Sequence, residues 1–260
     1  MITIDKYAYH SKLSHIKAAD KLFLTTLPLF ICIFASSNIV SVVTIISMCF
    51  ATIILGGFSG KQYVKILFIP SNFLAIGVIT IIINKLRPDS LDTLLSLRIF
   101  GGFYGITVQS FKTGITLYFK SLAAVSCLYF FSLNTPMNST FNYLRRLHLP
   151  IILIELMELT YRFIFVVWNE AYKIHIAQSA RLGYSKFTTS LKSLAELVST
   201  VFIKSMSRVE RANIALESRG FDGNFNCLIE EEEDSKILKV IGVLMSVVLL
   251  VIAMIERLIR

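Results

Sequence analysis

The chain offers few side chains whose type and spacing could support catalysis or metal binding. Its four histidines are His10, His15, His148 and His175, and none has another histidine or a carboxylate at the spacing of a metal site. The sequence also has no phosphate-binding loop and no nucleophile-elbow motif. We therefore predict no catalytic residue, no metal site and no cofactor bound by this chain.

The cysteines indicate packing rather than chemistry. Cys32, Cys49 and Cys127 lie inside apolar runs, whereas Cys227 lies in a polar segment. No two of them have C-x-x-C spacing, so the sequence predicts neither a disulfide framework nor a zinc site.

Two arginines are better candidates for a functional role. Arg181 and Arg219 each lie in the last turn of a predicted long helix, shortly before Gly183 or Gly220, which we expect to end the helix. A cation there stabilises the helix by about 0.3–1 kcal/mol through the helix dipole. This gain alone explains the presence of either arginine at its position. Arg219 also falls at the edge of an apolar helix face, where a guanidinium suits an acidic or carbonyl-lined groove on a partner. The residues alone leave both interpretations open.

The elements that carry these arginines belong to a membrane protein. Of the 260 residues, 55% are hydrophobic and 17% are charged, and the mean hydropathy is +0.68. Soluble domains have about 25% charged residues, so this chain lacks the charge that a water-exposed surface needs. The composition argues against a soluble enzyme and against a disordered chain, and predicts an all-α polytopic membrane protein.

Five apolar runs are close to the length of about 20 residues that a membrane-spanning helix needs. They cover residues 22–36, 39–55, 64–83, 106–133 and 237–255. We expect residues 1–136 to hold an N-terminal tail and four spans. Residues 137–223 would then form a cytoplasmic helical module, 224–236 an acidic linker, and 237–260 the final span.

The first helix of the module begins near Pro150 and is apolar enough to resemble a span. Its polar residues fall within about 120° of arc at 100° per residue, which instead favours an amphipathic helix at the membrane surface. Glu158 and Arg162 could form an ion pair across one turn. The polar residues of this arc are Glu155, Glu158, Arg162, Asn169, Glu170 and Lys173.

The second helix, counted from Phe187, has a clearer apolar face of about 100°. We predict that this face binds a partner subunit. The residues predicted to make the contact are Leu191, Leu194, Val198, Phe202, Val209 and Leu216, with Val201, Ser205 and Ala212 in the same arc.

The charge distribution predicts the orientation of the module. Between Arg145 and Arg219 there are eleven basic and six acidic residues, a net charge of +5 within a chain of +9. Basic residues of membrane proteins concentrate on the cytoplasmic side, so we expect the module and the N-terminus there. Because apolar stripes and spans adjoin these basic residues, we predict a lipid bilayer and no nucleic acid as partner.

With these residues in view, the chain resembles a known family, the T component of energy-coupling factor (ECF) transporters, and its cobalt-type CbiQ branch in particular. The resemblance covers most of the chain and is strongest over residues 135–223. The matching segments are Ile4-Asp5-Lys6-Tyr7-Ala8-Tyr9, Asn134-Thr135-Pro136 with Leu144, Leu147 and Pro150, Ala180-Arg181-Leu182, and Ala215-Leu216-Glu217 leading into Ser218-Arg219-Gly220. The two arginine motifs depart from the family pattern at Leu182, where glycine is usual, and at Ser218, where alanine is usual.

The resemblance implies a non-catalytic scaffold of an ABC-type importer. Its two motifs, Ala180 to Leu182 and Ser218 to Gly220, would dock on a pair of ECF ATPase subunits that bind ATP. The apolar helix faces would hold a separate substrate-binding membrane subunit of the cobalt or nickel type. Three alternatives remain: a T component that serves vitamin importers, a scaffold without transport activity, and an integral-membrane lipid enzyme built on Glu155, Glu158 and His148.

Overall fold

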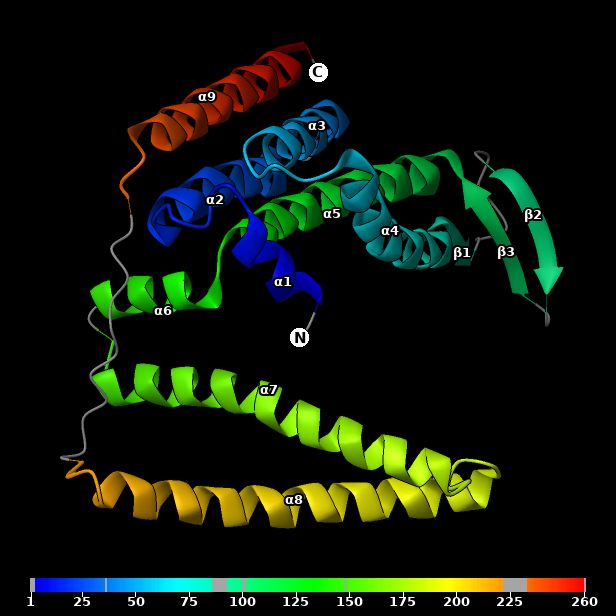
Figure 1. Cartoon of the computed structure of the whole chain (residues 1–260). Coiled ribbons are helices and arrows are strands. Elements are labelled where there is room, and N and C mark those ends of the chain that lie inside the picture. Colours follow the sequence, from blue (N-terminus) through cyan, green and yellow to red (C-terminus); the bar gives the residue numbers. More distant parts are fainter. Residues whose placement is uncertain are drawn as a thin grey trace. The chain divides into compact units, whose positions relative to one another are not determined.

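The structure of the chain, a computed structural model, describes residues 3–35, 37–85, 93–99, 102–147, 149–221 and 233–259. The chain divides into two compact units (Figure 1). One contains residues 2–143 and 231–260, and we call it the membrane unit. The other contains residues 144–230, and we call it the hairpin unit. Most of the predicted acidic linker lies outside the described residues.

The membrane unit is built from apolar helices. In the described part of the chain, α2, α4, α5 and α9 are long and apolar enough to cross a membrane, and α3 is a shorter apolar helix of 17 residues. The predicted all-α polytopic fold is therefore confirmed. The helices are α1 (Thr3–His10), α2 (Ala18–Ala35), α3 (Asn38–Ile54), α4 (Gly60–Ile82), α5 (Val108–Asn134) and α9 (Lys236–Ile259).

A small antiparallel sheet, which the sequence patterns did not predict, lies between α4 and α5. It consists of β1 (Ile83–Lys85), β2 (Thr93–Ile99) and β3 (Gly102–Thr107), in the order β1-β3-β2. The last strand runs directly into α5, where the Thr107 side chain accepts a hydrogen bond from the backbone N–H of Ser110. This N-cap starts the helix at Val108, two residues after the predicted start of the span.

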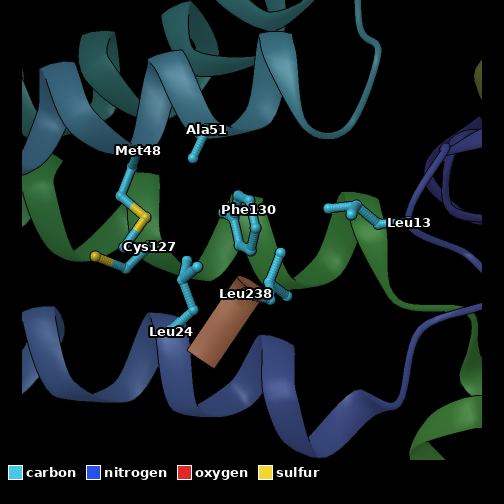
Figure 2. Packing of buried hydrophobic residues seen from close by; sticks show 7 residues of the cluster. All are labelled: Leu13, Leu24, Met48, Ala51, Cys127, Phe130 and Leu238. Atoms are coloured by element: carbon cyan, nitrogen blue, oxygen red, sulfur yellow. The ribbon is translucent and has the colours of Figure 1, made fainter. Parts of the chain in front are cut away.

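The core of the membrane unit joins the first, middle and last apolar helices of the chain. Buried side chains from α2, α3, α5 and α9 pack together with Leu13 from the segment before α2 (Figure 2). The cluster comprises Leu13, Leu24, Met48, Ala51, Cys127, Phe130 and Leu238. Large apolar side chains on α4 and α9, including Phe73 and Met254, stay exposed, as expected of surfaces that face lipid.

A buried polar cluster holds the end of α5. Asn134 accepts a hydrogen bond from the Ser11 hydroxyl at 2.7 Å and donates one to the Phe130 carbonyl at 2.7 Å. Lys21 is fully buried, and its Nζ donates to the Asn134 carbonyl at 2.9 Å. A cation at a helix C-terminus interacts favourably with the helix dipole and satisfies a carbonyl that has no partner within the helix. These contacts fix the point where the chain leaves the last helix before Pro136.

The hairpin unit contains the end of α6 (Met137–Arg146) and two long helices, α7 (Ile151–Ala180) and α8 (Phe187–Glu217). The two long helices lie antiparallel and side by side (Figure 1). Among the described helices, α7 does not meet the length and composition of a membrane span, in agreement with its amphipathic pattern. Glu158 forms an ion pair with Arg145, whose Nη2 lies 2.9 Å from its carboxylate, a partner from α6 that helical spacing within α7 did not suggest.

Candidate functional site: two helix ends that present arginine

The end of α7 is a tight backbone turn built around Leu182. The N–H of Leu182 donates to the Ser179 carbonyl at 3.1 Å, and the N–H of Gly183 donates to the Gln178 carbonyl at 2.9 Å. Leu182 has φ +57°, in the left-handed region. This pair of hydrogen bonds around a left-handed residue is the Schellman motif, which satisfies carbonyl groups at a helix C-terminus. Arg181 is the last residue before the left-handed one.

The end of α8 repeats the same turn. The N–H of Gly220 donates to the Glu217 carbonyl at 3.0 Å, and the N–H of Phe221 donates to the Leu216 carbonyl at 3.1 Å. Gly220 has φ +71°, so that Arg219 precedes the left-handed residue as Arg181 does. The two three-residue motifs therefore share one backbone geometry, although their sequences differ at two of three positions.

Leu182, and not Gly183 as predicted, takes the conformation that usually requires glycine. A residue with a Cβ loses about 1–2 kcal/mol in the left-handed region, because the Cβ crowds the following carbonyl oxygen. Gly183 is needed for a different reason. A Cβ on Gly183 would lie 2.7 Å from the Ser193 hydroxyl oxygen and 2.9 Å from the Gln178 carbonyl oxygen. Gly183 thus allows the start of α8 to approach the end of α7.

Three side chains that the sequence patterns did not single out stiffen this first helix end. Gln178 accepts a hydrogen bond from the Tyr184 hydroxyl at 2.8 Å and donates to the Ser193 carbonyl at 2.9 Å. The hydroxyl of Ser193 donates to the Gly183 carbonyl at 2.9 Å, and the ring of Tyr184 lies 4.6 Å from that of His175. Side chain to backbone bonds across a turn carry no periodic sequence signal, so only the folded hairpin reveals them.

Both motif arginines lie on the surface of the hairpin unit. Arg181 and Arg219 are exposed, and within the described residues neither has an ion-pair partner. Ala180 and Ser218 precede them, and the Ser218 hydroxyl donates to the Ile214 carbonyl at 2.7 Å. Each guanidinium is therefore attached to an ordered helix end and is available to an acidic or carbonyl-lined surface.

The two arginine turns lie near opposite ends of α8: the turn at Arg181 comes just before α8 begins, and the turn at Arg219 ends it. This helix has 31 residues and, at about 1.5 Å per residue, is about 46 Å long. A small domain is only about 30 Å across. One small partner domain cannot contact both arginine ends at once, whereas two partner domains can.

Most of the predicted partner face of α8 remains uncovered. In the same apolar arc, Val201, Ser205 and Ala212 are half-buried, so α7 covers only one side of the arc. Leu216 is also half-buried. The exposed members are Leu191, Leu194, Val198, Phe202 and Val209, and each is at least half exposed. An apolar stripe of this length on an otherwise charged helix indicates an interaction surface.

A groove of about 570 Å³ lies between α7 and α8 beside this stripe. Its walls include Phe163, Val167 and Ile203, and Lys204 forms an ion pair with Glu170 across it. The hydrogen bond from Lys204, with its positive charge, lowers the pKa of Glu170. The groove combines apolar walls with the Glu170–Lys204 ion pair and with the cations Arg208 and Arg211, which also line it.

Of the three residues considered for a lipid enzyme, the structure describes only Glu155 and Glu158. Glu158 is engaged by Arg145, while Glu155 is half-buried on the same helix. His148 lies outside the described residues. In the part of the chain that the structure describes, no group of three or more histidine, cysteine, aspartate or glutamate side chains could hold a metal ion.

Comparison with known proteins identifies the family. The family model described as "CbiQ: Cobalt transport protein" matches residues 10–227. An uncharacterized protein of Methanocaldococcus jannaschii is 28% identical over 89% of this chain and 85% of its own length.

Two similar proteins have names that describe transport. The cobalt transport protein CbiQ of Salmonella typhimurium is 28% identical over 87% of this chain and 100% of its own length. A putative fused cobalt transport protein, CbiMQ, of Methanocorpusculum labreanum is 33% identical over 73% of this chain, which corresponds to 31% of that longer protein. With a matching family model over most of its length and several apolar helices of spanning length, this multi-pass membrane chain belongs to the CbiQ cobalt transport family.

Proposed function

We propose that the chain is the transmembrane scaffold and energy-coupling subunit of an ECF-type ABC importer for cobalt or nickel ions. It transmits a conformational change from a pair of ATPase subunits to a separate substrate-binding membrane subunit. The observation that carries this proposal is the pair of equivalent helix ends, each presenting an exposed arginine and separated by the length of α8. ATP binds to the partner ATPases, and this chain has no catalytic role.

The geometry supports one docking point for each of two ATPase subunits. Arg181 and Arg219 are held on Schellman turns at either end of one stiff helix. When the two ATPase subunits approach each other, they displace the two ends of the hairpin together with α7 and α8. Because a long helix transmits displacement along its axis, the exposed apolar stripe of α8 moves with its ends.

The apolar stripe supports a second membrane subunit as the recipient of that movement. Its exposed residues, among them Val198 and Phe202, require an apolar cover that α7 does not supply. The Methanocorpusculum relative is named a fused cobalt transport protein, and this chain matches only 31% of it. That relative therefore includes a further part, which in the present system we assign to a separate ion-binding subunit. The positive charge of the hairpin unit supports a cytoplasmic location for this unit and for the N-terminus.

Charge reversal at both motif arginines tests the proposal. In the complete transporter, Arg181→Glu combined with Arg219→Glu should abolish co-purification of the ATPase subunits and uptake of radioactive cobalt, while membrane insertion remains normal. The matched control reverses Lys192 and Arg211, two exposed cations on α8, and should retain both properties. Normal uptake by the first double variant would show that the arginine ends do not couple the ATPases.

A further inference from the structure

The two arginine ends have the same backbone but not the same surface. Leu182 and Gly220 occupy equivalent left-handed positions, each directly after an arginine. At the second end, a Cβ placed on Gly220 would have no neighbouring atom within 4 Å. At this position the second end therefore has no side chain, whereas the first end has a leucine directly after its arginine.

The leucine is retained in an unfavourable backbone conformation although, among the described residues, little of its side chain is buried. Leu182 is 73% exposed, so its side chain gains little from burial in the hairpin unit. Glycine would form the same two turn hydrogen bonds without crowding, as Gly220 does at the other end. Strained residues that persist at exposed positions are concentrated at functional sites, where the side chain has a role that outweighs its conformational cost.

We propose that Leu182 inserts into an apolar pocket of an ATPase subunit beside the site that receives Arg181. This inference rests on the proposed docking function and specifies the partner surface at the first helix end. The pocket combines a carbonyl-lined or acidic groove for the guanidinium with an apolar wall for the leucine. At the second end the equivalent position is glycine, and the adjacent apolar side chain, that of Phe221, is 37% exposed. Because Leu182 is 73% exposed and Phe221 only 37%, the two ends contribute unequally to assembly, and the Arg181 end makes the larger apolar contact.

The test compares stability of the chain with affinity for the ATPase. Leu182→Gly relieves the strained backbone, and Leu182→Asn keeps a side chain that tolerates the left-handed region but is polar. Both variants of the full chain, purified in detergent, should melt at or above the wild-type temperature. Both should bind co-expressed and purified ECF ATPase subunits about tenfold more weakly, as expected from loss of a buried leucine side chain. Leu182→Met, which keeps apolar bulk, should bind within about threefold of wild type.

Pairing these variants with arginine substitutions locates the effect. In an Arg219→Ala background, Leu182→Gly should weaken ATPase binding by the same factor as in the wild type. In an Arg181→Ala background it should weaken binding much less, because Leu182 and Arg181 share one pocket. Wild-type affinity in Leu182→Gly, or a lowered melting temperature, would overturn the inference even if charge reversal of both arginines abolishes binding. If charge reversal leaves ATPase binding intact, the proposed docking function fails, and this inference fails with it.

Discussion

Nη2 of Arg145 lies 2.9 Å from both carboxylate oxygens of Glu158, and this contact joins the last turn of α6 to the early part of α7. The two side chains are only 22% and 20% exposed. A partly buried, charge-assisted hydrogen bond is stronger than an exposed ion pair. This contact therefore helps to fix the start of the hairpin unit.

Breaking this contact should loosen the start of α7. Arg145→Met or Glu158→Gln should lower the free energy of unfolding by about 1–3 kcal/mol, because each leaves one polar partner without its counterpart. Amide hydrogen exchange of residues 151–160 and thermal melting in detergent measure the effect. Glu155→Gln is the matched control on the same helix and should change little. A double-mutant cycle without coupling between Arg145 and Glu158 would contradict the prediction.

A methyl group at Gly56 should destabilise the membrane unit. A Cβ there would overlap the Asn134 side-chain oxygen and lie 2.5 Å from the Thr52 carbonyl oxygen. Gly56→Ala should therefore displace the buried cluster at the end of α5, at a cost of about 1–3 kcal/mol in unfolding free energy. Gly77→Ala is the control, because a Cβ on Gly77 has nothing within 4 Å. Equal melting temperatures for the two variants would show that the cluster is not closely packed.

A charge on the apolar stripe should prevent binding of one proposed partner of α8 and leave the other bound. Phe202 is 65% exposed, and Phe202→Asp should prevent binding of the ion-binding membrane subunit because the carboxylate would lose its water in the contact. The ATPase subunits, which bind the helix ends, should still co-purify. Ile214→Asp changes an equally exposed residue about 120° away around the helix and serves as the control. Retention of the membrane subunit by Phe202→Asp would place its contact elsewhere.

Acidification should weaken the pairing of α7 and α8. The pKa of Glu170 in the folded chain is lowered from its ordinary value of 4.5, first by the hydrogen bond and charge of Lys204. A lowered folded-state pKa gives stabilisation that is present above about pH 4.5 and is lost as the pH falls through the folded value. Carbon-detected NMR titration of the Glu170 carboxyl group measures this pKa. Lys204→Met should raise it toward 4.5, whereas Lys192→Met should leave it unchanged. A Glu170 pKa that does not respond to Lys204→Met would refute the assignment.

The long helices could be predicted because their apolar spacing is local information. The pattern counted from Phe187 begins at the residue where α8 begins, and the polar arc beginning at Glu155 distinguishes α7 from a span. The helix stop at Leu182 could not be predicted, since propensity assigns left-handed positions to glycine and Gly183 is the next residue. The contact between Glu158 and Arg145 could also not be predicted, because Arg145 comes from the preceding helix, whereas helical spacing suggested only Arg162 as a partner. The three strands between residues 83 and 107 form by pairing between segments, which no single apolar run reports.

The buried carboxylate of Asp20 has a consequence for the order in which the chain assembles. Asp20 is 2% exposed, and its partners are the Ser235 backbone N–H at 3.0 Å and the Lys239 ammonium group at 3.2 Å. Both partners are synthesised more than 200 residues after Asp20. Burial of an unpaired carboxylate is strongly unfavourable, so α2 cannot complete its packing until α9 has been translated and inserted. The first apolar helix to leave the ribosome is thus among the last to reach its final environment, and premature truncation before residue 235 leaves it unfinished.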